Sequence, residues 1–257
     1  MIADDYLFGA LMHQKDVCAG VIERLLNMQP MQITYPEIQK TISPFYDTKG
    51  IRLDVLANDG KTLYNIEMQT SRTSSLPLRM RYYQGLLDVD SLMKGSKYES
   101  LCQSYVIFIC TKDPFSLGRP VYTFVNTCQE DTSLKLGDKS IKVLYNASAW
   151  ESDGNDERSG LLRYIDEGTA TTAFTQRLEK LAQEVKNMNL FKRRYMMRNI
   201  YLDDAMERGA ELNLRRNVIG LYKNKVAIST IATSVERTQA EIKEILRNEL
   251  GPDACQE

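Results

Sequence analysis

Hydrophobic and polar residues alternate along residues 51–69, on both sides of the pair Asp59 and Gly60. An alternation with a period of two predicts β-strands, and Asp-Gly between two such runs is among the strongest short-range signals of a hairpin. The first strand carries Asp54 and the returning strand carries Glu67. We therefore expect a hairpin whose two strands bring acidic residues near one another.

The length of the turn decides whether these two acids share a face of the hairpin. With Asp59 and Gly60 as a two-residue loop, Asp54 lies opposite Asn65, and Glu67 lies diagonally on the same face, roughly 7–8 Å away. A slip of one residue would move Glu67 to the other face. At the diagonal separation, two carboxylates can lean together around one small cation.

The remaining elements of the first part of the chain follow from similar patterns. Apolar residues recur at helical spacing over residues 5–28 and over residues 77–95. Residues 104–111 form a near-continuous apolar run, which is typical of a central strand covered on both faces. Residues 121–128 and 140–145 predict two further strands. This order of helices and strands indicates an α/β fold with a mixed central sheet.

The pattern changes near residue 150, where a polar stretch precedes helical spacing over residues 161–224. Residues 225–248 predict two short helices, and Thr238 with Glu241 forms a capping box that starts the second. This tail resembles a helix-turn-helix, although many helical hairpins share the pattern. We expect three parts: an α/β core at 1–150, a helical extension packed on the core at 151–210, and a basic helix with the helix-turn-helix-like tail at 211–257.

The composition is that of an ordinary globular protein, with 43% hydrophobic and 26% charged residues among 257. No apolar run approaches the roughly 18 residues that a membrane span needs, and the first residues are acidic where a secretory signal would be basic. We expect a cytoplasmic protein with no membrane partner. The five cysteines form no Cys-x-x-Cys pair, which argues against a disulfide framework or a zinc ribbon.

A single histidine, His13, narrows the chemistry that the chain can perform. Histidine-dependent triads and two-histidine metal sites would have to be built on that one residue, so any catalysis should rest on carboxylates. Carboxylate oxygens select hard cations such as Mg²⁺ or Mn²⁺. Glu23, one turn from the apolar face of the first helical segment, is a candidate third carboxylate, but the same position also suits an ordinary surface glutamate.

Positive charge follows the hairpin directly. Arg72, Arg79 and Arg81 fall near the start of the helix predicted at residues 77–95. Arginine can hold a phosphodiester by bidentate hydrogen bonds, and Tyr83 could stack on a base. The same residues also fit an amphipathic helix with an ordinary basic edge.

A second concentration of positive charge lies in the later helical region. Residues 190–225 contain nine Lys or Arg and four Asp or Glu, a local excess of +5 in a chain whose net charge is −1. A basic stripe can follow a phosphate backbone. A solvated helix face has the same composition, so both interpretations stay open.

The hairpin residues resemble a known family. Arg52-Leu53-Asp54-Val55, then Tyr64-Asn65-Ile66-Glu67-Met68-Gln69, and then Arg79 and Tyr82-Tyr83 are similar to the recombination-promoting nuclease (Rpn) or putative transposase family, a branch of the PD-(D/E)XK nuclease superfamily. The similarity continues through residues 121–148, the segment LLRYIDEG and the tail IATSVERTQAEI, so it spans most of the chain. It implies a restriction-endonuclease-like α/β core followed by a helical C-terminal region.

The resemblance also implies a site and an activity. Asp54, Glu67 and the backbone carbonyl of Met68 would bind Mg²⁺ or Mn²⁺, with Glu23 joining through water, in a DNA endonuclease that hydrolyses phosphodiester bonds. Gln69 stands where the wider superfamily usually has lysine, and would position the nucleophile. The phosphate and DNA contacts would come from the residues named above: Arg72, Arg79, Arg81 and Tyr83. The partner would be DNA, and the C-terminal helices would form a homodimer.

Two alternatives from other classes fit the same sequence. One is a DNA-binding remnant of a mobile element that keeps the fold but cleaves weakly or not at all, which the glutamine at position 69 favours. The other is a self-association or protein-interaction module in which the long helices form the contact surface. In that module the acidic face of the hairpin is only solvated.

Overall fold

The structure, a computed structural model, describes residues 2–29, 32–34, 36–43 and 49–251 of the chain. It divides into two units, Met1–Met188 and Asn189–Glu257.

The first unit contains five α-helices and eight strands within its described residues. The helices are α1 (Asp5–Met12), α2 (Lys15–Leu26), α3 (Leu76–Ser91), α4 (Asp156–Glu167) and α5 (Ala173–Asn187), with short 3₁₀ turns η1 (Tyr98–Ser100) and η2 (Ala147–Ser152). The strands are β1 (Glu37–Ile38), β2 (Thr41–Ile42), β3 (Ile51–Arg52), β4 (Val55–Asn58), β5 (Thr62–Gln69), β6 (Gln103–Cys110), β7 (Val121–Phe124) and β8 (Ser140–Asn146).

Six of the strands form one sheet in the order β1-β4-β5-β6-β8-β7. Strands β5, β6 and β8 run parallel to one another, while β1, β4 and β7 pair antiparallel with their neighbours. The sheet is therefore mixed, as the sequence predicted. Four consecutive residues of β6, Val106–Ile109, have no solvent exposure (0%). That burial on both faces explains the continuous apolar run in the sequence.

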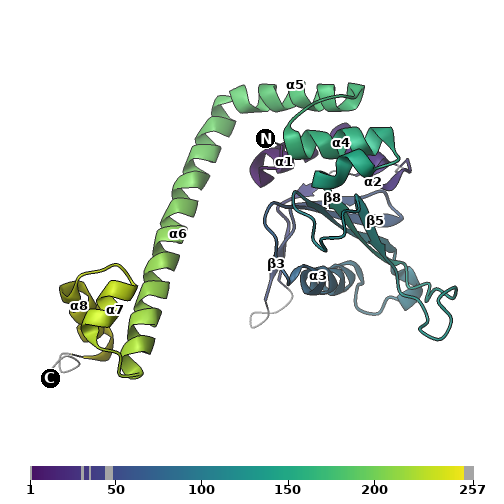
Figure 1. The fold of residues 1–257 in the computed structure, drawn as a ribbon. Coiled ribbons are helices and arrows are strands. Elements are labelled where there is room, and N and C mark those ends of the chain that lie inside the picture. The colour runs from purple at the N-terminus through teal and green to yellow at the C-terminus, as the bar shows by residue number, and fades with distance from the viewer. Residues whose placement is uncertain (1, 30–31, 35, 44–48, 252–257) are drawn as a thin grey trace. The chain divides into compact units, whose positions relative to one another are not determined.

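Helices cover both faces of this sheet (Figure 1). Helix α3 packs on one face, where its Met80 and Tyr83 join Phe108 of β6 and Leu144 of β8 in one core. Helices α1, α2 and α4 lie on the other side (Figure 1). There the Tyr145 hydroxyl of β8 donates a hydrogen bond of 2.5 Å to the carbonyl of Leu25 in α2. The result is a three-layer α/β unit.

The predicted hairpin is present as β4 and β5, but its register differs from the one expected. Leu56 lies opposite Asn65 and Asn58 opposite Leu63, so the connection is two residues longer than a two-residue loop. The reason lies in Asp59, whose carboxylate accepts hydrogen bonds from the backbone N–H groups of Lys61 (2.9 Å) and Thr62 (2.7 Å) and so stabilises a wider turn. A shift of two residues leaves every side chain on its predicted face.

The chain that leads into β4 separates from β5 at Asp54, and this point of separation is called the fork. The β4–β5 ladder ends at the pair Val55 and Ile66, and the preceding strand β3 leaves β5 to pair with β2. The backbone of Asp54 follows the departing side, since its carbonyl accepts a 3.0 Å hydrogen bond from the N–H of Gln39. Beyond this fork, residues 67–69 of β5 have no strand of the hairpin beside them.

The division into units differs from the boundaries expected at residues 150 and 210. Helix α4 buries Leu161, Leu162 and Ile165 and lies within the first unit, which ends at Met188. The three-part division expected from the sequence stays a prediction. Helix α6 (Asn189–Lys223) runs unbroken across residue 210. Helical spacing identified these segments as helices but carried no information on which unit their apolar faces join.

The second unit consists of α6, α7 (Ile228–Ser234) and α8 (Gln239–Leu250). Its core contains Val218 from α6, Ile231 and Ala232 from α7, and Ile242 and Leu246 from α8. The predicted capping box is confirmed, because the Thr238 hydroxyl accepts from the N–H of Glu241, whose carboxylate accepts in return from the N–H of Thr238. Two short helices, α7 and α8, pack on the longer α6. Whether they act as a helix-turn-helix is not tested by this packing, and that interpretation stays a prediction.

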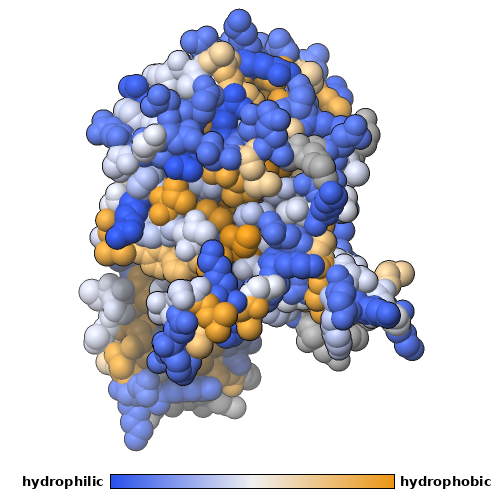
Figure 2. Space-filling model, turned by 90° about the vertical axis from the view of Figure 1, so that its right-hand side faces the viewer, coloured by the Kyte–Doolittle hydropathy of each residue, from blue (hydrophilic) through white to orange (hydrophobic). Residues whose placement is uncertain are grey.

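Several large hydrophobic side chains stay exposed on the surface. In the second unit they include Met196, Tyr201 and Met206 of α6, each at least 65% exposed. Figure 2 shows hydrophobic residues exposed among hydrophilic ones on one face of the molecule. The homodimer expected through the C-terminal helices stays a prediction. In the described part of the chain, no helix is both long enough and apolar enough to cross a membrane.

Close packing between α2 and α5 predicts a pair of matched glycine variants. A Cβ at Gly20 would lie 2.4 Å from the ring of Phe174, whereas a Cβ at Gly85 in α3 would meet nothing within 4 Å. We expect Gly20→Ala to destabilise the protein by about 1–3 kcal/mol through overpacking. Gly85→Ala should be neutral or stabilising by up to about 1 kcal/mol. Thermal denaturation of both variants checks the difference, and equal melting temperatures would contradict this packing.

Candidate active site

Two carboxylates meet at the fork in the hairpin. The carboxylate of Glu67 accepts a 3.1 Å hydrogen bond from the backbone N–H of Asp54. In return, the carboxylate of Asp54 accepts a 3.0 Å hydrogen bond from the backbone N–H of Met68. Each acid is thus tied to the backbone of the strand that carries the other. This reciprocal arrangement is available only because β3 leaves β5 at Asp54, which frees the N–H of Met68 from a strand partner.

Glu67 sits in an environment that disfavours its charge. Its side chain is 2% exposed, and burial together with the negative charge of Asp54 raises the pKa of Glu67 to about 8. Arg79 acts in the opposite direction and lowers this pKa. A buried carboxylate with a strongly raised pKa beside a second acid is typical of a functional site, because the charge lacks a fully compensating cation.

Arg79 and Gln69 form one hydrogen-bonded unit next to the two acids. The guanidinium of Arg79 donates to Oε1 of Gln69 at 2.8 Å and to the hydroxyl of Tyr83 at 3.2 Å. It also lies over the rings of Tyr83 and Phe108, 5.5 and 5.2 Å from their centroids. Nε2 of Gln69 donates to the carbonyl (2.5 Å) and hydroxyl (3.1 Å) of Ser71. Both polar atoms of Gln69 are therefore occupied, and they fix the position of Arg79.

The oxygen atoms at the fork fit a hard divalent cation. Asn65 is 0% exposed and, two residues before Glu67, shares its face of β5. Neither polar atom of the Asn65 side chain reaches a hydrogen-bond partner within the described residues, although its amide still lowers the pKa of Glu67 from longer range. An orphaned buried amide beside two carboxylates indicates a missing polar ligand.

The backbone carbonyl of Met68 belongs to the same oxygen set. Within a strand the N–H and C=O of one residue point to the same side, and the N–H of Met68 points at Asp54. The next carbonyl, that of Gln69, points the other way and accepts from the N–H of Thr111, which follows β6. The Met68 carbonyl is thus directed toward the fork.

The predicted third carboxylate is not part of this group. Across the described residues, no three His, Cys, Asp or Glu side chains are grouped so that they could hold a metal ion. Glu23 lies on α2 with its side chain 45% exposed, 4.0 Å from the guanidinium of Arg24. A cation at the fork would therefore have two carboxylate ligands and would complete its shell with neutral oxygens. Mg²⁺ commonly binds in this way.

The remaining predicted DNA contacts are distributed around the first turns of α3. Arg72 is exposed and donates to the hydroxyl of Ser116, and Arg81 is exposed on α3. Tyr83 is only 8% exposed and packs against Phe108, with ring centroids 6.0 Å apart. Its ring is therefore not free to stack on a base, and the sequence-based expectation for Tyr83 is wrong in that respect. Tyr83 instead supports Arg79.

Comparison with protein families adds an independent observation. The family described as "PD-(D/E)XK nuclease family transposase" matches residues 4–196, three quarters of the chain, and the match includes the fork and α3. The chain belongs to this family. The searches of curated proteins and of solved structures returned no match.

Membership among the PD-(D/E)XK nuclease family transposases confirms the family resemblance and the restriction-endonuclease-like fold class expected from the sequence. Helices α7 and α8 lie beyond the matched residues. Sequence reasoning missed two features of this site, the orphaned Asn65 and the coupling of Gln69 to Arg79. The alternation of β5 placed Asn65 on the face of Glu67, and that was a usable signal. The contact between Gln69 and Arg79 crosses a loop and left no comparable trace in the sequence.

Proposed function

We propose that the protein is a divalent-metal-dependent DNA endonuclease that hydrolyses phosphodiester bonds at the fork between β4 and β5. The observation that carries this proposal is the reciprocal bonding of Asp54 and Glu67 to each other's strand. It holds the two acidic side chains in fixed positions beside each other. Membership of a nuclease-type transposase family supports DNA as the substrate.

Asp54, Glu67 and the carbonyl of Met68 would hold Mg²⁺ or Mn²⁺, with the amide oxygen of Asn65 close by. When bound, such a cation lowers the pKa of a coordinated water and offsets negative charge on the scissile phosphate. The protein contributes the fixed position of these oxygens. Glu67 must lose its proton to serve as a ligand, and binding of a cation would favour that ionised form.

Arg79 supplies the permanent positive charge that Gln69 lacks. Its guanidinium is half-buried, oriented by Gln69 and Tyr83, and close enough to lower the pKa of Glu67. In this position it can donate two hydrogen bonds to a phosphate oxygen pair and stabilise charge that develops during hydrolysis. Gln69 is then a positioning residue that acts through Arg79, rather than the group that positions the nucleophile.

A charge-removing variant tests the role of Arg79. We expect Arg79→Gln to lower the rate of plasmid nicking by about 10²-fold, because one preorganised donor to the transition state is lost. Arg79→Lys should recover part of the rate, since it keeps the charge but not the two-point hydrogen bonding. Arg163→Gln is the matched control, because Arg163 also lies over an aromatic ring, 4.5 Å from the centroid of Trp150 on α4's side of the sheet. If Arg79→Gln nicks as fast as this control, Arg79 has no catalytic role.

The proposed activity itself is tested with purified protein and supercoiled plasmid. Nicked or linear product is expected with Mg²⁺ or Mn²⁺ and not with EDTA, and binding should weaken as salt rises. Absence of product under all these conditions would refute the endonuclease proposal. Retention of the plasmid without product would instead support a DNA-binding remnant of a mobile element. A lack of both binding and product would favour the protein-interaction alternative.

A further inference from the structure

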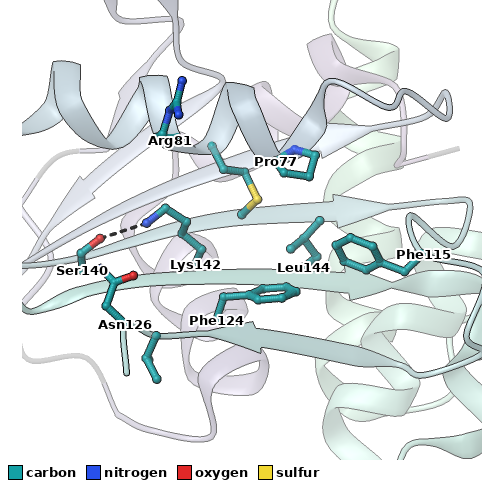
Figure 3. Close-up of a pocket in the computed structure, with 10 residues that line it drawn as sticks. Pro77, Arg81, Phe115, Phe124, Asn126, Ser140, Lys142 and Leu144 are labelled. Carbon is teal, nitrogen blue, oxygen red and sulfur yellow. Dashed lines mark hydrogen bonds between the residues drawn. The ribbon is translucent and has the colours of Figure 1, made fainter. Parts of the chain in front are cut away.

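A pocket of about 530 Å³ lies on the α3 face of the sheet, between the start of α3, the edge strand β7 and its neighbour β8 (Figure 3). Helix α3 packs against β6, and β8 and then β7 lie farther out in the sheet on this face. Its lining is mainly apolar, with two basic side chains and no carboxylate, and it includes Arg81, Phe115, Phe124, Asn126, Ser140 and Lys142.

The register of the sheet places this pocket close to the acid pair. Glu67 of β5 lies beside Phe108 of β6, which lies beside Leu144 of β8, and all three side chains are on the α3 face. Two strand spacings separate Glu67 from Leu144, a distance of about 10 Å. That distance equals about three base-pair steps along the axis of a DNA duplex. Because α3 covers Phe108 between the two sites, a DNA strand bound at Glu67 would reach the pocket around the start of α3, where Pro77 lines it.

Aromatic rings form one wall. Phe124 is 47% exposed at the end of the edge strand β7, and its ring packs at 5.6 Å on Phe115. Phe115 is in turn held edge-on against Tyr122, 4.9 Å between centroids. In Figure 3 Phe115 and Phe124 lie along one side of the pocket, with α3 along the opposite side. The exposed ring of Phe124 therefore packs on a second ring that is itself held in place by a third, and it offers a flat surface to a ligand.

Positive charge lies beside these rings. The ammonium of Lys142 donates to the hydroxyl of Ser140 at 3.2 Å. Arg81 stands on α3 at the rim (Figure 3). Two acids lie outside the lining. Burial raises the pKa of Asp88, and the nearby ammonium of Lys142 offsets part of that rise. Asp138 accepts a 2.7 Å hydrogen bond from Asn126. Within the lining itself the charge is positive.

We propose that this pocket binds an unpaired nucleotide of the DNA strand, with its base stacked on Phe124 and its phosphate held by Lys142 and Arg81. A planar aromatic surface next to cations matches the two parts of a nucleotide, since every base has a π-face and every phosphate a negative charge. The inference rests on the proposed function and adds to it a preference for DNA that contains an unpaired base.

Binding is measured in EDTA, so that no cleavage occurs, with two labelled duplexes that differ only in one unpaired 2-aminopurine. Wild-type protein should bind the duplex with the unpaired base more tightly than the fully paired one and should change the 2-aminopurine fluorescence. Phe124→Ala should raise the Kd for the unpaired-base duplex about tenfold and leave the Kd for the paired duplex unchanged. Phe124→Tyr, which keeps the ring, should behave as wild type. Lys142→Gln should weaken binding and reduce the salt dependence by about one phosphate contact.

Leu78→Ala is the matched control, because Leu78 is an exposed apolar residue of α3 that does not line the pocket. If Phe124→Ala binds both duplexes as Leu78→Ala does, the nucleotide pocket is refuted while the nuclease proposal stands. A change in sedimentation of Phe124→Ala, with DNA binding intact, would make the pocket a contact between protein chains and would also refute it. If wild-type protein binds neither duplex and does not nick plasmid, the proposed function itself is refuted.

Discussion

Asp54→Asn is expected to abolish Mg²⁺-dependent nicking of supercoiled plasmid, with a loss of about 10³-fold or more. Asparagine has nearly the same shape as aspartate and can still accept the hydrogen bond from the N–H of Met68. The variant therefore removes the charge at the fork and leaves the hairpin bonded as before. Losing one of two carboxylates that hold a catalytic cation costs several kcal/mol of transition-state stabilisation, and each 1.4 kcal/mol is a factor of ten in rate.

Asp166→Asn provides the comparison for this variant, because Asp166 is a half-buried acid on α4, the helix on the opposite side of the sheet from α3. Its nicking rate should match that of wild type. Melting curves of both variants should overlap with wild type in EDTA. Equal nicking rates for Asp54→Asn and Asp166→Asn would show that the fork is not the reacting centre.

Glu67→Gln is expected to make the metal-free protein more stable at alkaline pH and to remove part of its pH dependence. The pKa of Glu67 rises from 4.5 to about 8 in the folded protein. Between these two values the folded state holds a proton that the unfolded state has released, so stability is full below about pH 4.5 and is lost as the pH rises through about 8. Glutamine is neutral at every pH and can still accept the N–H of Asp54.

Thermal denaturation of both proteins in EDTA from pH 5 to pH 8.5 measures this effect. The melting temperature of wild type should fall relative to that of Glu67→Gln by about 5–10 °C over that range. A shift of several pKa units in the folded state corresponds to a few kcal/mol of unfolding free energy. Adding Mn²⁺ at pH 8 should raise the melting temperature of wild type and not that of Glu67→Gln, because ligands bind the cation in their ionised form. Parallel pH profiles of the two proteins would contradict the assigned environment of Glu67.

The sequence predicted the hairpin and the shared face of its two acids, although the predicted length of the turn was wrong. Alternation depends only on whether a register shift is even or odd, and the observed shift relative to the predicted pairing is two residues. The shift arises because the carboxylate of Asp59 accepts hydrogen bonds from the N–H groups of Lys61 and Thr62. These bonds stabilise a turn of four residues in place of a two-residue turn. Propensity rules for Asp-Gly describe the backbone and do not include this side-chain contact.

The parts that sequence reasoning missed depend on contacts between distant segments. Helical spacing predicted that residues 161–224 are helical, but it gave no sign that the first unit ends at Met188, between α5 and α6. Tyrosine is a residue type that can stack on a base, but the packing of α3 on β6 buries the ring of Tyr83. The link from Gln69 to Arg79 joins the end of β5 to the second turn of α3, and no local pattern encodes it.

Two backbone amides at the fork have side-chain acceptors in place of backbone ones. The N–H groups of Asp54 and Met68 are bonded to carboxylates instead of to carbonyl groups of a neighbouring strand. Their exchange with deuterated solvent therefore depends on how firmly two side chains stay in place, while the flanking amides of β5 depend on the ladder with β6. Slower exchange at these two positions on addition of a cation would report occupancy of the fork directly, in the absence of any DNA.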